Sequence, residues 1–373
     1  MKKSTLLFIF GTRPEAIKLA PLIREFKSRN EFNTLVCVTA QHRQMLDQVL
    51  SFFEITPDYD LDIMMPDQTL FDVTANALKK LEPVLTSASP ACVFVQGDTT
   101  TAFVGALAAY YKKIKVAHIE AGLRSHDKYS PFPEEMNRTL AGHLADFHFT
   151  PTLQAVEHLN NENIKKNIFN VGNTVIDALF LGLEQVRKSK NKLSLPFLNS
   201  GNRMVLITGH RRESFGQPFE NICTAISTLA SKYSGVEFLY PVHLNPNVQE
   251  PVKRMLANKK NVHLIEPLDY PEFIQMIERS SVVLTDSGGL QEEAPSLGKP
   301  VLVMRDVTER MEGVTAGTAK LVGTNIDLIV SEMSALLDDK EAYDKMAKAV
   351  NPYGDGTSCK QIADIINKLL NNK

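Results

Sequence analysis

The chain alternates between short apolar segments rich in β-branched residues and longer segments with the spacing of amphipathic helices. The first apolar run, 5–10, is followed by a helical pattern that carries Leu22, Ile23 and Phe26, and the alternation continues to the run 282–285. A strand–helix–strand repeat places its strands parallel, with right-handed crossovers. The sequence therefore predicts an α/β fold of parallel sheets wrapped by helices.

The chain is long enough for two domains. At 373 residues it exceeds the length of about 250–300 residues at which a single core stops growing. A polar, lysine-containing stretch without strong periodicity lies within 172–202, where we expect the connection between domains. The first domain is predicted to span 1–172 and the second 173–356. Proline and glycine residues in 351–356 isolate a final helix within 357–373, which is free to pack outside the second domain.

The composition is that of an ordinary globular protein, with 43% hydrophobic and 23% charged residues. A formal net charge of -2 gives no reason to expect a nucleic acid or an anionic membrane as partner. No apolar stretch approaches the ~20 residues of a membrane-spanning helix, and the N-terminal apolar run is too short for a signal peptide. Four widely spaced cysteines predict reduced, buried thiols, so we expect a cytoplasmic protein.

A glycine-containing turn follows the buried run 282–285, with the sequence DSGG at 286–289. A helical stretch begins at Leu290, so its unpaired N–H groups and the positive end of its dipole lie beside glycines that a ligand can approach closely. This arrangement suits a phosphate, and Glu293, about one turn further on, can accept hydrogen bonds from ribose hydroxyls. The motif is equally consistent with an ordinary strand–helix turn, and the rest of the chain decides between the two.

Two further strand ends carry polar residues that can face a ligand. The first apolar run leads into GTRPE, which contains Arg13, and Lys18 follows in the first part of the next helix. The second run ends in a loop with Gln41 and Gln44. Surface solvation is the usual fate of such side chains, but α/β proteins bind ligands at the carboxyl ends of their strands.

Three acidic residues follow successive elements in the first half of the chain. Asp98 and Glu120 each follow an apolar strand-like run, and Glu134 opens a helical segment. Each has a structural explanation as a helix cap, a strand end or a partner of the helix dipole. Because the carboxyl ends of parallel strands meet at one edge of a sheet, however, we expect Asp98 and Glu120 to lie close together, with Arg13 nearby. Three acids there exceed what capping requires.

Two histidines are predicted to lie at neighbouring strand ends. His210 lies in GHRRESFG, whose two arginines suit a negatively charged ligand, and His243 lies in YPVHLNPNV. A lone histidine is more often a structural hydrogen-bonding group, but two at adjacent strand ends favour a ligand site. No HxxxH or HExxH spacing occurs, so the sequence predicts no catalytic metal.

Taken together, these segments resemble the non-hydrolysing UDP-N-acetylglucosamine 2-epimerases over essentially the whole chain. The resemblance rests on ten motifs in the family's order: GTRPEAIKLAPL, TAQHRQMLDQVL, GDTTT, EAGLR, PFPEEMNR, GNTVIDAL, GHRRESFG, YPVHLNPNV, LTDSGGLQEEAPSLGKPVLVMRDVTER and NPYGDG. It implies two Rossmann-like domains facing across a cleft, as in B-type glycosyltransferases, with the C-terminal helix returning to the first domain. It also implies a homodimer that needs neither NAD nor a metal and interconverts UDP-N-acetylglucosamine and UDP-N-acetylmannosamine.

The resemblance implies roles for individual residues. The catalytic residues are Asp98, Glu120 and Glu134, with His210 assisting. The residues that hold UDP are Arg13, Lys18, Ser287, Gly288, Gly289, Glu293 and Arg310, with the main chain of Leu268 and a contact from Phe273 near the uracil. Some bacterial members bind a second UDP-N-acetylglucosamine beside the active site as an activator, at positions that correspond here to Gln41, Gln44 and His243.

The chemistry implied by the family needs groups of this kind. Inverting C2 of the sugar without redox requires removal of a hydrogen that is hardly acidic, and elimination of UDP to 2-acetamidoglucal avoids a free carbanion. Carboxylates exchange the proton, and the DSGG turn with Arg13 and Arg310 stabilises the leaving diphosphate. A UDP-sugar-dependent glycosyltransferase or a sensor without turnover would use the same fold and UDP site; the three acids favour the epimerase.

Overall fold

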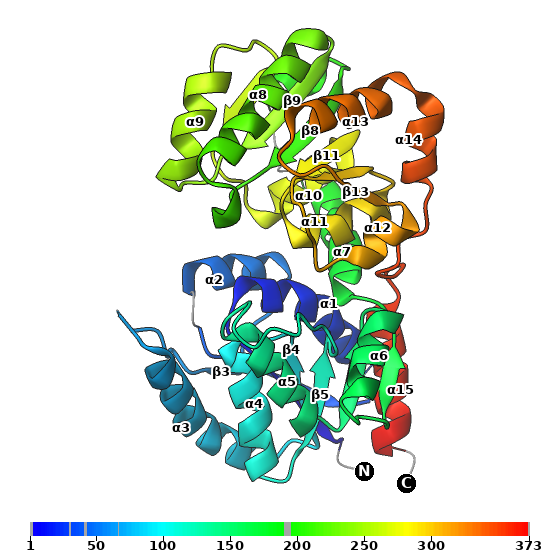
Figure 1. Ribbon diagram of the computed structural model, residues 1–373. Helices are drawn as coiled ribbons and strands as arrows, with labels where there is room; N and C mark the ends of the chain where they lie inside the picture. Colours follow the sequence, from blue (N-terminus) through cyan, green and yellow to red (C-terminus); the bar gives the residue numbers. More distant parts are fainter. Residues whose placement is uncertain (1–2, 30, 41–42, 66, 190–194, 372–373) are drawn as a thin grey trace. The chain divides into compact units, whose positions relative to one another are not determined.

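The computed structural model describes residues 3–29, 31–40, 43–65, 67–189 and 195–371. The chain forms two compact units (Figure 1). The first comprises Met1–Leu181 and Tyr353–Lys373, and the second Gly182–Pro352.

The first unit contains a seven-stranded sheet in the order β3-β2-β1-β4-β5-β6-β7, in which every neighbouring pair is parallel. Its strands are β1 (Thr5–Phe10), β2 (Asn33–Val38), β3 (Tyr59–Asp60), β4 (Cys92–Gln96), β5 (Lys115–Ile119), β6 (Phe147–Thr150) and β7 (Ile168–Asn170). Its helices are α1 (Arg13–Arg29), α2 (Arg43–Phe52), α3 (Leu70–Ala88), α4 (Thr100–Tyr111), α5 (Glu134–Leu144), α6 (Leu153–Asn161), the first part of α7 (Thr174–Lys188) and α15 (Ser358–Asn371).

The second unit contains a six-stranded sheet in the order β10-β9-β8-β11-β12-β13, again parallel throughout. Its strands are β8 (Arg203–Thr208), β9 (Val236–Pro241), β10 (Val262–Ile265), β11 (Val282–Thr285), β12 (Val301–Val303) and β13 (Ala319–Leu321). Its helices are α8 (Gln217–Lys232), α9 (Pro246–Leu256), α10 (Tyr270–Arg279), α11 (Gly288–Glu293), α12 (Met311–Ala316), α13 (Ile326–Asp338) and α14 (Lys340–Ala347), with 3-10 turns η1 (Pro196–Asn199), η2 (Arg212–Ser214) and η3 (Ala294–Leu297). The predicted fold of two Rossmann-like parallel sheets wrapped by helices is confirmed.

The second sheet is apolar on both faces, which explains why its strands are continuous hydrophobic runs in the sequence. Val205 and Ile207 of β8 pack in a cluster with residues of α8, α9 and α13. The alternating residues Met204 and Leu206 pack in a second cluster with residues of α10. Because successive side chains of a strand point to opposite faces, one apolar run supplies both layers of core.

Strand register determines where the acidic residues of the first unit emerge. β4 and β5 pair with Gln96 opposite Ile119, and the backbone N–H of Gly97 donates to the carbonyl of Ile119 at 2.9 Å. Asp98 and Glu120 therefore follow neighbouring strands at the same, carboxyl edge of the sheet, which is the reason that the sequence predicts them together.

The chain passes between the two units inside α7 and again at the start of its C-terminal segment. The sequence predicts the boundaries at 172/173 and 356/357, whereas the units divide between Leu181 and Gly182 and between Pro352 and Tyr353. α15 belongs to the first unit and packs on α1, where Arg29 Nη1 lies 2.5 Å from Asp364 Oδ1.

Some elements differ from those expected from the sequence. α12 and β13 are not predicted, because runs of six and three residues carry too little periodicity. β3 has only two residues, Tyr59–Asp60, although the sequence predicts a strand over 59–63, and Asp62 has a left-handed φ of 43°. The single helix predicted from Leu290 is divided into α11 and η3, with Pro295, which has no N–H to donate, just after the change.

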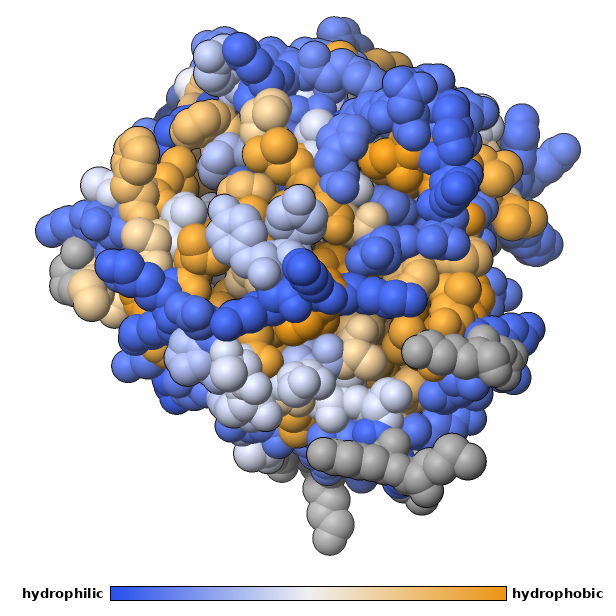
Figure 2. All heavy atoms as spheres, turned by 90° about the horizontal axis from the view of Figure 1, so that it is seen from below, coloured by the Kyte–Doolittle hydropathy of each residue, from blue (hydrophilic) through white to orange (hydrophobic). Residues whose placement is uncertain are grey.

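All four cysteines are free and buried, which confirms the prediction for the thiols. Burial raises the pKa of Cys37 and of Cys223 to about 12, so neither is a reactive thiolate near neutral pH. Hydrophilic and hydrophobic residues are interspersed over the face of the molecule in Figure 2. Among the helices that the structure describes, none is both long and apolar enough to cross a membrane.

Candidate active site

Asp98 lies in the turn after β4 and is held from α5. Asn137 Nδ2 donates to the backbone carbonyl of Asp98 at 3.0 Å, and Arg138 Nη2 donates to Asp98 Oδ2 at 2.5 Å. The ring N–H at His118 Nε2 donates to the carbonyl of Gly97 at 2.7 Å, which holds the preceding residue in place. The Asp98 side chain is still 30% exposed, so a ligand can reach it.

The charges around Asp98 show that the three predicted acids share one electrostatic environment. Burial raises the pKa of Asp98, the positive charge of Arg138 opposes this shift, and the charge of Glu120 reinforces it. Lys18 lowers and Glu134 raises the same pKa by smaller amounts. A carboxyl whose pKa lies above its ordinary value is suited to accept and return a proton.

Glu120 follows β5 with a left-handed φ of 62°, and its side chain is 5% exposed. Lys18 Nζ donates to its two carboxylate oxygens at 2.6 and 2.7 Å. Two side-chain amides also donate to the carboxylate, Gln96 to Oε2 and Asn173 to Oε1 at 2.9 Å. The structure thus pairs Lys18 with an acid, whereas the family resemblance assigns it to UDP.

Glu134 is the first residue of α5 and is half-buried. The next residue, Glu135, is buried and accepts hydrogen bonds from the backbone N–H groups of Ser125 and His126, both at 3.0 Å. Glu135 therefore fixes the loop before α5, while Glu134 contributes its charge at Asp98.

Glu15 organises the loop between β1 and α1. Its Oε2 accepts from the backbone N–H groups of Gly11 and Thr12 at 3.0 and 2.8 Å, and its Oε1 accepts from Thr99 Oγ1 at 2.7 Å. Burial raises the pKa of Glu15. Arg13 is the first residue of α1, directly after this loop, and its side chain forms no hydrogen bond or ion pair with any residue that the structure describes. A cation in that setting is available to a ligand.

The second unit brings the two predicted histidines together at the carboxyl edge of its sheet. The buried Asp286, which follows β11, accepts hydrogen bonds at Oδ2 from the backbone N–H groups of His210 and Arg211, at 2.6 and 2.7 Å. His210 Nδ1 lies 3.7 Å from Asp286 Oδ1, and the His210 ring stacks on His243 with centroids 5.0 Å apart. Burial and the charge of His210 lower the pKa of His243.

α11 follows the turn after β11, but it begins at Gly288, two residues before the start predicted at Leu290, with Ser287 as its N-cap residue. A Cβ on Gly288 would lie 2.9 Å from Arg310 Cζ, so a larger residue there would displace that guanidinium. Arg310 Nε donates to Glu292 Oε1 at 2.9 Å. Glu293, the last residue of α11, is buried. The structure therefore brings the predicted turn, Glu293 and Arg310 together beyond the end of β11.

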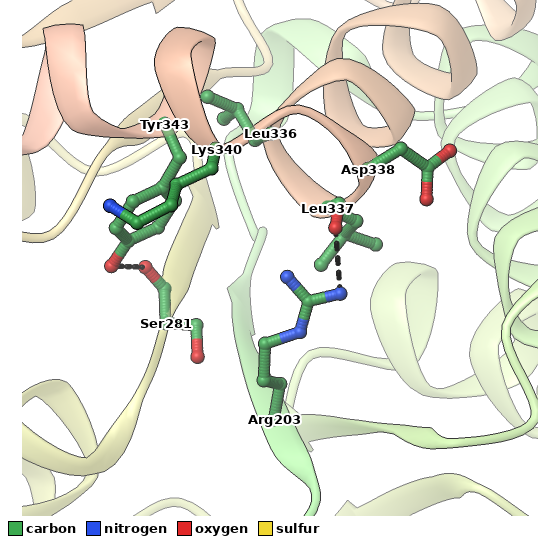
Figure 3. Close-up of a pocket in the computed structure, with 7 residues that line it drawn as sticks. All are labelled: Arg203, Ser281, Leu336, Leu337, Asp338, Lys340 and Tyr343. Carbon is green, nitrogen blue, oxygen red and sulfur yellow. Dashed lines mark hydrogen bonds between the residues drawn. The ribbon is translucent and has the colours of Figure 1, made fainter.

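A hollow of about 430 Å³ lies at the opposite, amino end of the second sheet (Figure 3). Arg203 Nη2 donates to the carbonyl of Leu337 at 2.7 Å, and the Tyr343 hydroxyl donates to the carbonyl of Ser281 at 3.1 Å. These bonds tie α13 and α14 to the starts of β8 and β11, so we interpret the residues around this hollow as structural.

A family model described as UDP-N-acetylglucosamine 2-epimerase matches residues 24–367. The chain belongs to this family of isomerases. It is 54% identical over 363 residues to the UDP-N-acetylglucosamine 2-epimerase of Salmonella typhimurium, with 96% of each chain covered.

Solved structures of family members have the same fold. The crystal structure of UDP-GlcNAc 2-epimerase from Neisseria meningitidis bound to UDP-GlcNAc is 49% identical, with a TM-score of 0.89 over 98% of this chain and 100% of that chain. The enzyme from Methanocaldococcus jannaschii in complex with UDP-GlcNAc and UDP is 35% identical, with a TM-score of 0.79 over 97% of this chain and 99% of that chain.

The remaining residues implied by the family resemblance are less fully defined. The side chains of Leu268 and Phe273 are partly buried against the core of the second sheet. Gln41 lies outside the described residues, and Gln44 lies in α2, with a side chain that is also outside the description. No group of three or more histidine, cysteine, aspartate or glutamate side chains in the described part of the chain is arranged to hold a metal ion.

Three residues that support the candidate site are absent from the sequence-based set. They are the buried polar residues Glu15, Gln96 and Asn173. Glu15 has one partner 3 residues away and another 84 residues away in the chain. Gln96 and Asn173 both contact Glu120, which lies 24 and 53 residues away from them. The one available signal is position, because each lies at or just after a strand that ends at the carboxyl edge.

Proposed function

We propose that this chain interconverts UDP-N-acetylglucosamine (UDP-GlcNAc) and UDP-N-acetylmannosamine (UDP-ManNAc) by eliminating UDP and adding it back. A carboxylate takes the C2 proton as the C1–O bond breaks, and the electron pair of that bond leaves with UDP to give 2-acetamidoglucal. Protonation of C2 on the opposite face and attack of a UDP oxygen on C1 give the other epimer. No oxidant or reductant is needed to balance these steps.

The observation that carries this proposal is the cluster of three carboxylates at the carboxyl edge of the first sheet. Asp98 and Glu120 follow adjacent strands, and the charges of Glu120 and Glu134 both act on the pKa of Asp98. Inversion at C2 needs proton exchange on both faces of the sugar, so at least two acid–base groups are required. A glycosyltransferase or a sensor has no comparable need for three.

The second unit supplies groups suited to UDP. The glycine turn at 287–289 and the guanidinium of Arg310 offer N–H donors and positive charge to a diphosphate. Glu293 is placed to accept hydrogen bonds from ribose hydroxyls. We assign Arg13 of the first unit to the diphosphate as well, because its side chain has no partner among the described residues. Relatives solved with UDP-GlcNAc and UDP support a UDP-sugar as the ligand.

His210 is assigned an assisting role in the same reaction. The backbone N–H groups of His210 and of the next residue, Arg211, both donate to Asp286, which fixes the position of His210. The His210 side chain remains 46% exposed, so the ring can reach a bound ligand. An imidazole near a departing diphosphate can donate a hydrogen bond to it.

Proton NMR of purified protein with either sugar nucleotide tests the proposal. Each epimer should give the same equilibrium mixture of UDP-GlcNAc and UDP-ManNAc without added NAD or metal. Release of free sugar would indicate hydrolysis, and binding without turnover would indicate a sensor; either result would contradict the proposal.

We further propose that a second UDP-GlcNAc activates the enzyme at a site that includes Gln41, Gln44 and His243. The support comes from the family resemblance and from the stacking of His243 on His210, which gives an occupied activator site a direct contact with a residue of the reaction.

We also propose that the chain forms a homodimer through the exposed face of α3 and α4. Tyr110 and Tyr111 are 59% and 63% exposed there, beside an ion pair in which Lys112 Nζ lies 3.2 Å from Glu82 Oε1. Apolar surface rimmed by both charges can meet its own copy across a two-fold axis. Light scattering should show a dimer that Tyr111→Glu converts to a monomer and the control Leu153→Glu, on α6, does not; a dimer in both variants would place the interface elsewhere.

A further inference from the structure

Asn173 connects a proposed catalytic carboxylate to the backbone of the segment that joins the two units. It lies between β7 and α7 and is 2% exposed. Its Nδ2 donates to Glu120 Oε1 at 2.9 Å, and its Oδ1 accepts from the backbone N–H of Val175 at 3.1 Å. Its own backbone N–H donates to the carbonyl of Tyr353 at 2.7 Å. One residue therefore contacts Glu120, the start of α7 and the returning chain.

The start of α7 and the segment that begins at Tyr353 both belong to the connections between the two units. α7 continues into the second unit, and Tyr353 is the first residue after the chain comes back. They approach closely at a glycine: a Cβ on Gly172 would lie 2.9 Å from Ser358 Oγ and 3.1 Å from both Gly354 Cα and the Tyr353 carbonyl oxygen. Gly172 and Gly354 have φ values of 87° and 119°, which other residues rarely adopt. The backbone of Asn173 is thus held against Tyr353.

Lys18 and Gln96 also donate to Glu120, from α1 and β4. Lys18 contacts both carboxylate oxygens, and Gln96 donates to Oε2 from β4. An ammonium is a point charge that tolerates rotation of its partner. The amides of Gln96 and Asn173, one on each oxygen, define the plane of the carboxylate.

We propose that Asn173 is a positioning residue for Glu120, setting the orientation of the carboxylate from the junction where the chain passes between its two units. The inference rests on the proposed function, in which Glu120 exchanges a proton with the sugar. A base must lie within hydrogen-bond reach of that proton, so a small rotation of the carboxylate lowers the rate without removing any group that binds UDP.

Asn173→Ser separates this role from a structural one. The serine hydroxyl can still accept from Val175 N–H as a helix cap, and the backbone bond to Tyr353 is untouched, but the donor to Glu120 is lost. We expect kcat to fall roughly 10- to 100-fold, with UDP affinity and melting temperature close to wild type. Asn173→Asp also keeps the cap, replaces the donor by a second carboxylate, and should lower kcat further. Asn325→Ser, the same substitution at the cap of α13, is the matched control and should leave kcat unchanged.

A double-mutant cycle with Glu120→Gln distinguishes this role from a purely structural one, because it measures whether the effect of Asn173 on kcat depends on Glu120. If Asn173 acts through Glu120, the fold decrease in kcat of the double variant should be much smaller than the product of the decreases in the two single variants. If the fold decreases in kcat multiply in the double variant, or if Asn173→Ser has the kcat of wild type, the inference is wrong. Either result would leave the proposed function standing. A wild-type protein that does not interconvert the two sugar nucleotides would overturn the proposed function, and the inference with it.

Discussion

Lys18 and Glu120 form an ion pair in which one ammonium contacts both carboxylate oxygens, at 2.6 and 2.7 Å. The pair joins the first turns of α1 to the end of β5. Arg13, one helical turn or so before Lys18, has no side-chain partner among the described residues. Two cations on one helix therefore have different surroundings, and we expect them to have different functions.

Lys18→Met should lower kcat and leave UDP affinity nearly unchanged, because its charge is directed at Glu120. Arg13→Met should weaken UDP binding by roughly tenfold or more, since a hydrogen bond to a charged group contributes about 1.5–3 kcal/mol. That loss should shrink at high salt. Calorimetry with UDP and steady-state kinetics measure the two effects, and an equal loss of UDP affinity in both variants would place Lys18 on the diphosphate.

The three acids can be tested by replacing each with its amide. Asp98→Asn, Glu120→Gln and Glu134→Gln keep nearly the same shape but cannot accept a proton as a base. Each should still bind UDP, melt within a few degrees of wild type and lose at least roughly 10²-fold in kcat. A lost cap would instead cost about 0.5–2 kcal/mol of stability and need not affect the rate. A variant that melts early but turns over normally would return that residue to a structural role.

The buried His118 should make the first unit sensitive to acid. Burial lowers its pKa from 6.5 to about 4, so between these values the unfolded chain binds a proton that the folded chain does not. The stability that is present above pH 6.5 is therefore lost as the pH falls, by about 2 kcal/mol at pH 5.

Urea unfolding at about pH 7.5 and about pH 5 should show this loss in wild type. The free energy of unfolding of His118→Gln should fall by about 2 kcal/mol less than that of wild type over the same pH interval, because glutamine does not titrate. His143→Gln, which replaces an exposed histidine of the same unit, should behave like wild type. Identical pH dependence in wild type and His118→Gln would contradict the prediction.

Activation by UDP-GlcNAc should appear in the kinetics. Initial rates from UDP-GlcNAc should rise sigmoidally, and reaction from UDP-ManNAc alone should show a lag that a trace of the other epimer shortens. His243→Ala should make the first curve hyperbolic by removing part of the activator site. Hyperbolic kinetics without a lag in wild type would mean that the chain does not use such a site.

The parts of the fold that could be predicted depend on local patterns. The apolar runs of β4 and β5 identify two strands, and parallel pairing then requires Asp98 and Glu120 to emerge at one edge. The same reasoning places His210 and the turn at 287–289 after the paired strands β8 and β11. Hydrophobic periodicity and the geometry of parallel sheets are enough for these inferences.

Side-chain partners could not be predicted in the same way. Lys18 and Glu120 are 102 residues apart, and Asn173 and Glu120 are 53 apart. Which donor reaches which oxygen depends on helix orientation and on packing at the glycine contact between Gly172 and Gly354, and neither produces a pattern in one sequence. The short elements α12 and β13 are not predicted for a related reason, because tertiary packing rather than periodicity defines them.

The most direct test of the proposed chemistry is to run the reaction in D2O. Elimination places the C2 proton on a carboxylate that exchanges with solvent, and the returning proton comes from solvent. Purified protein incubated with UDP-GlcNAc in D2O should therefore give UDP-ManNAc with deuterium at C2, detected by NMR and mass spectrometry. UDP-ManNAc that retains the original hydrogen at C2 would contradict the elimination mechanism.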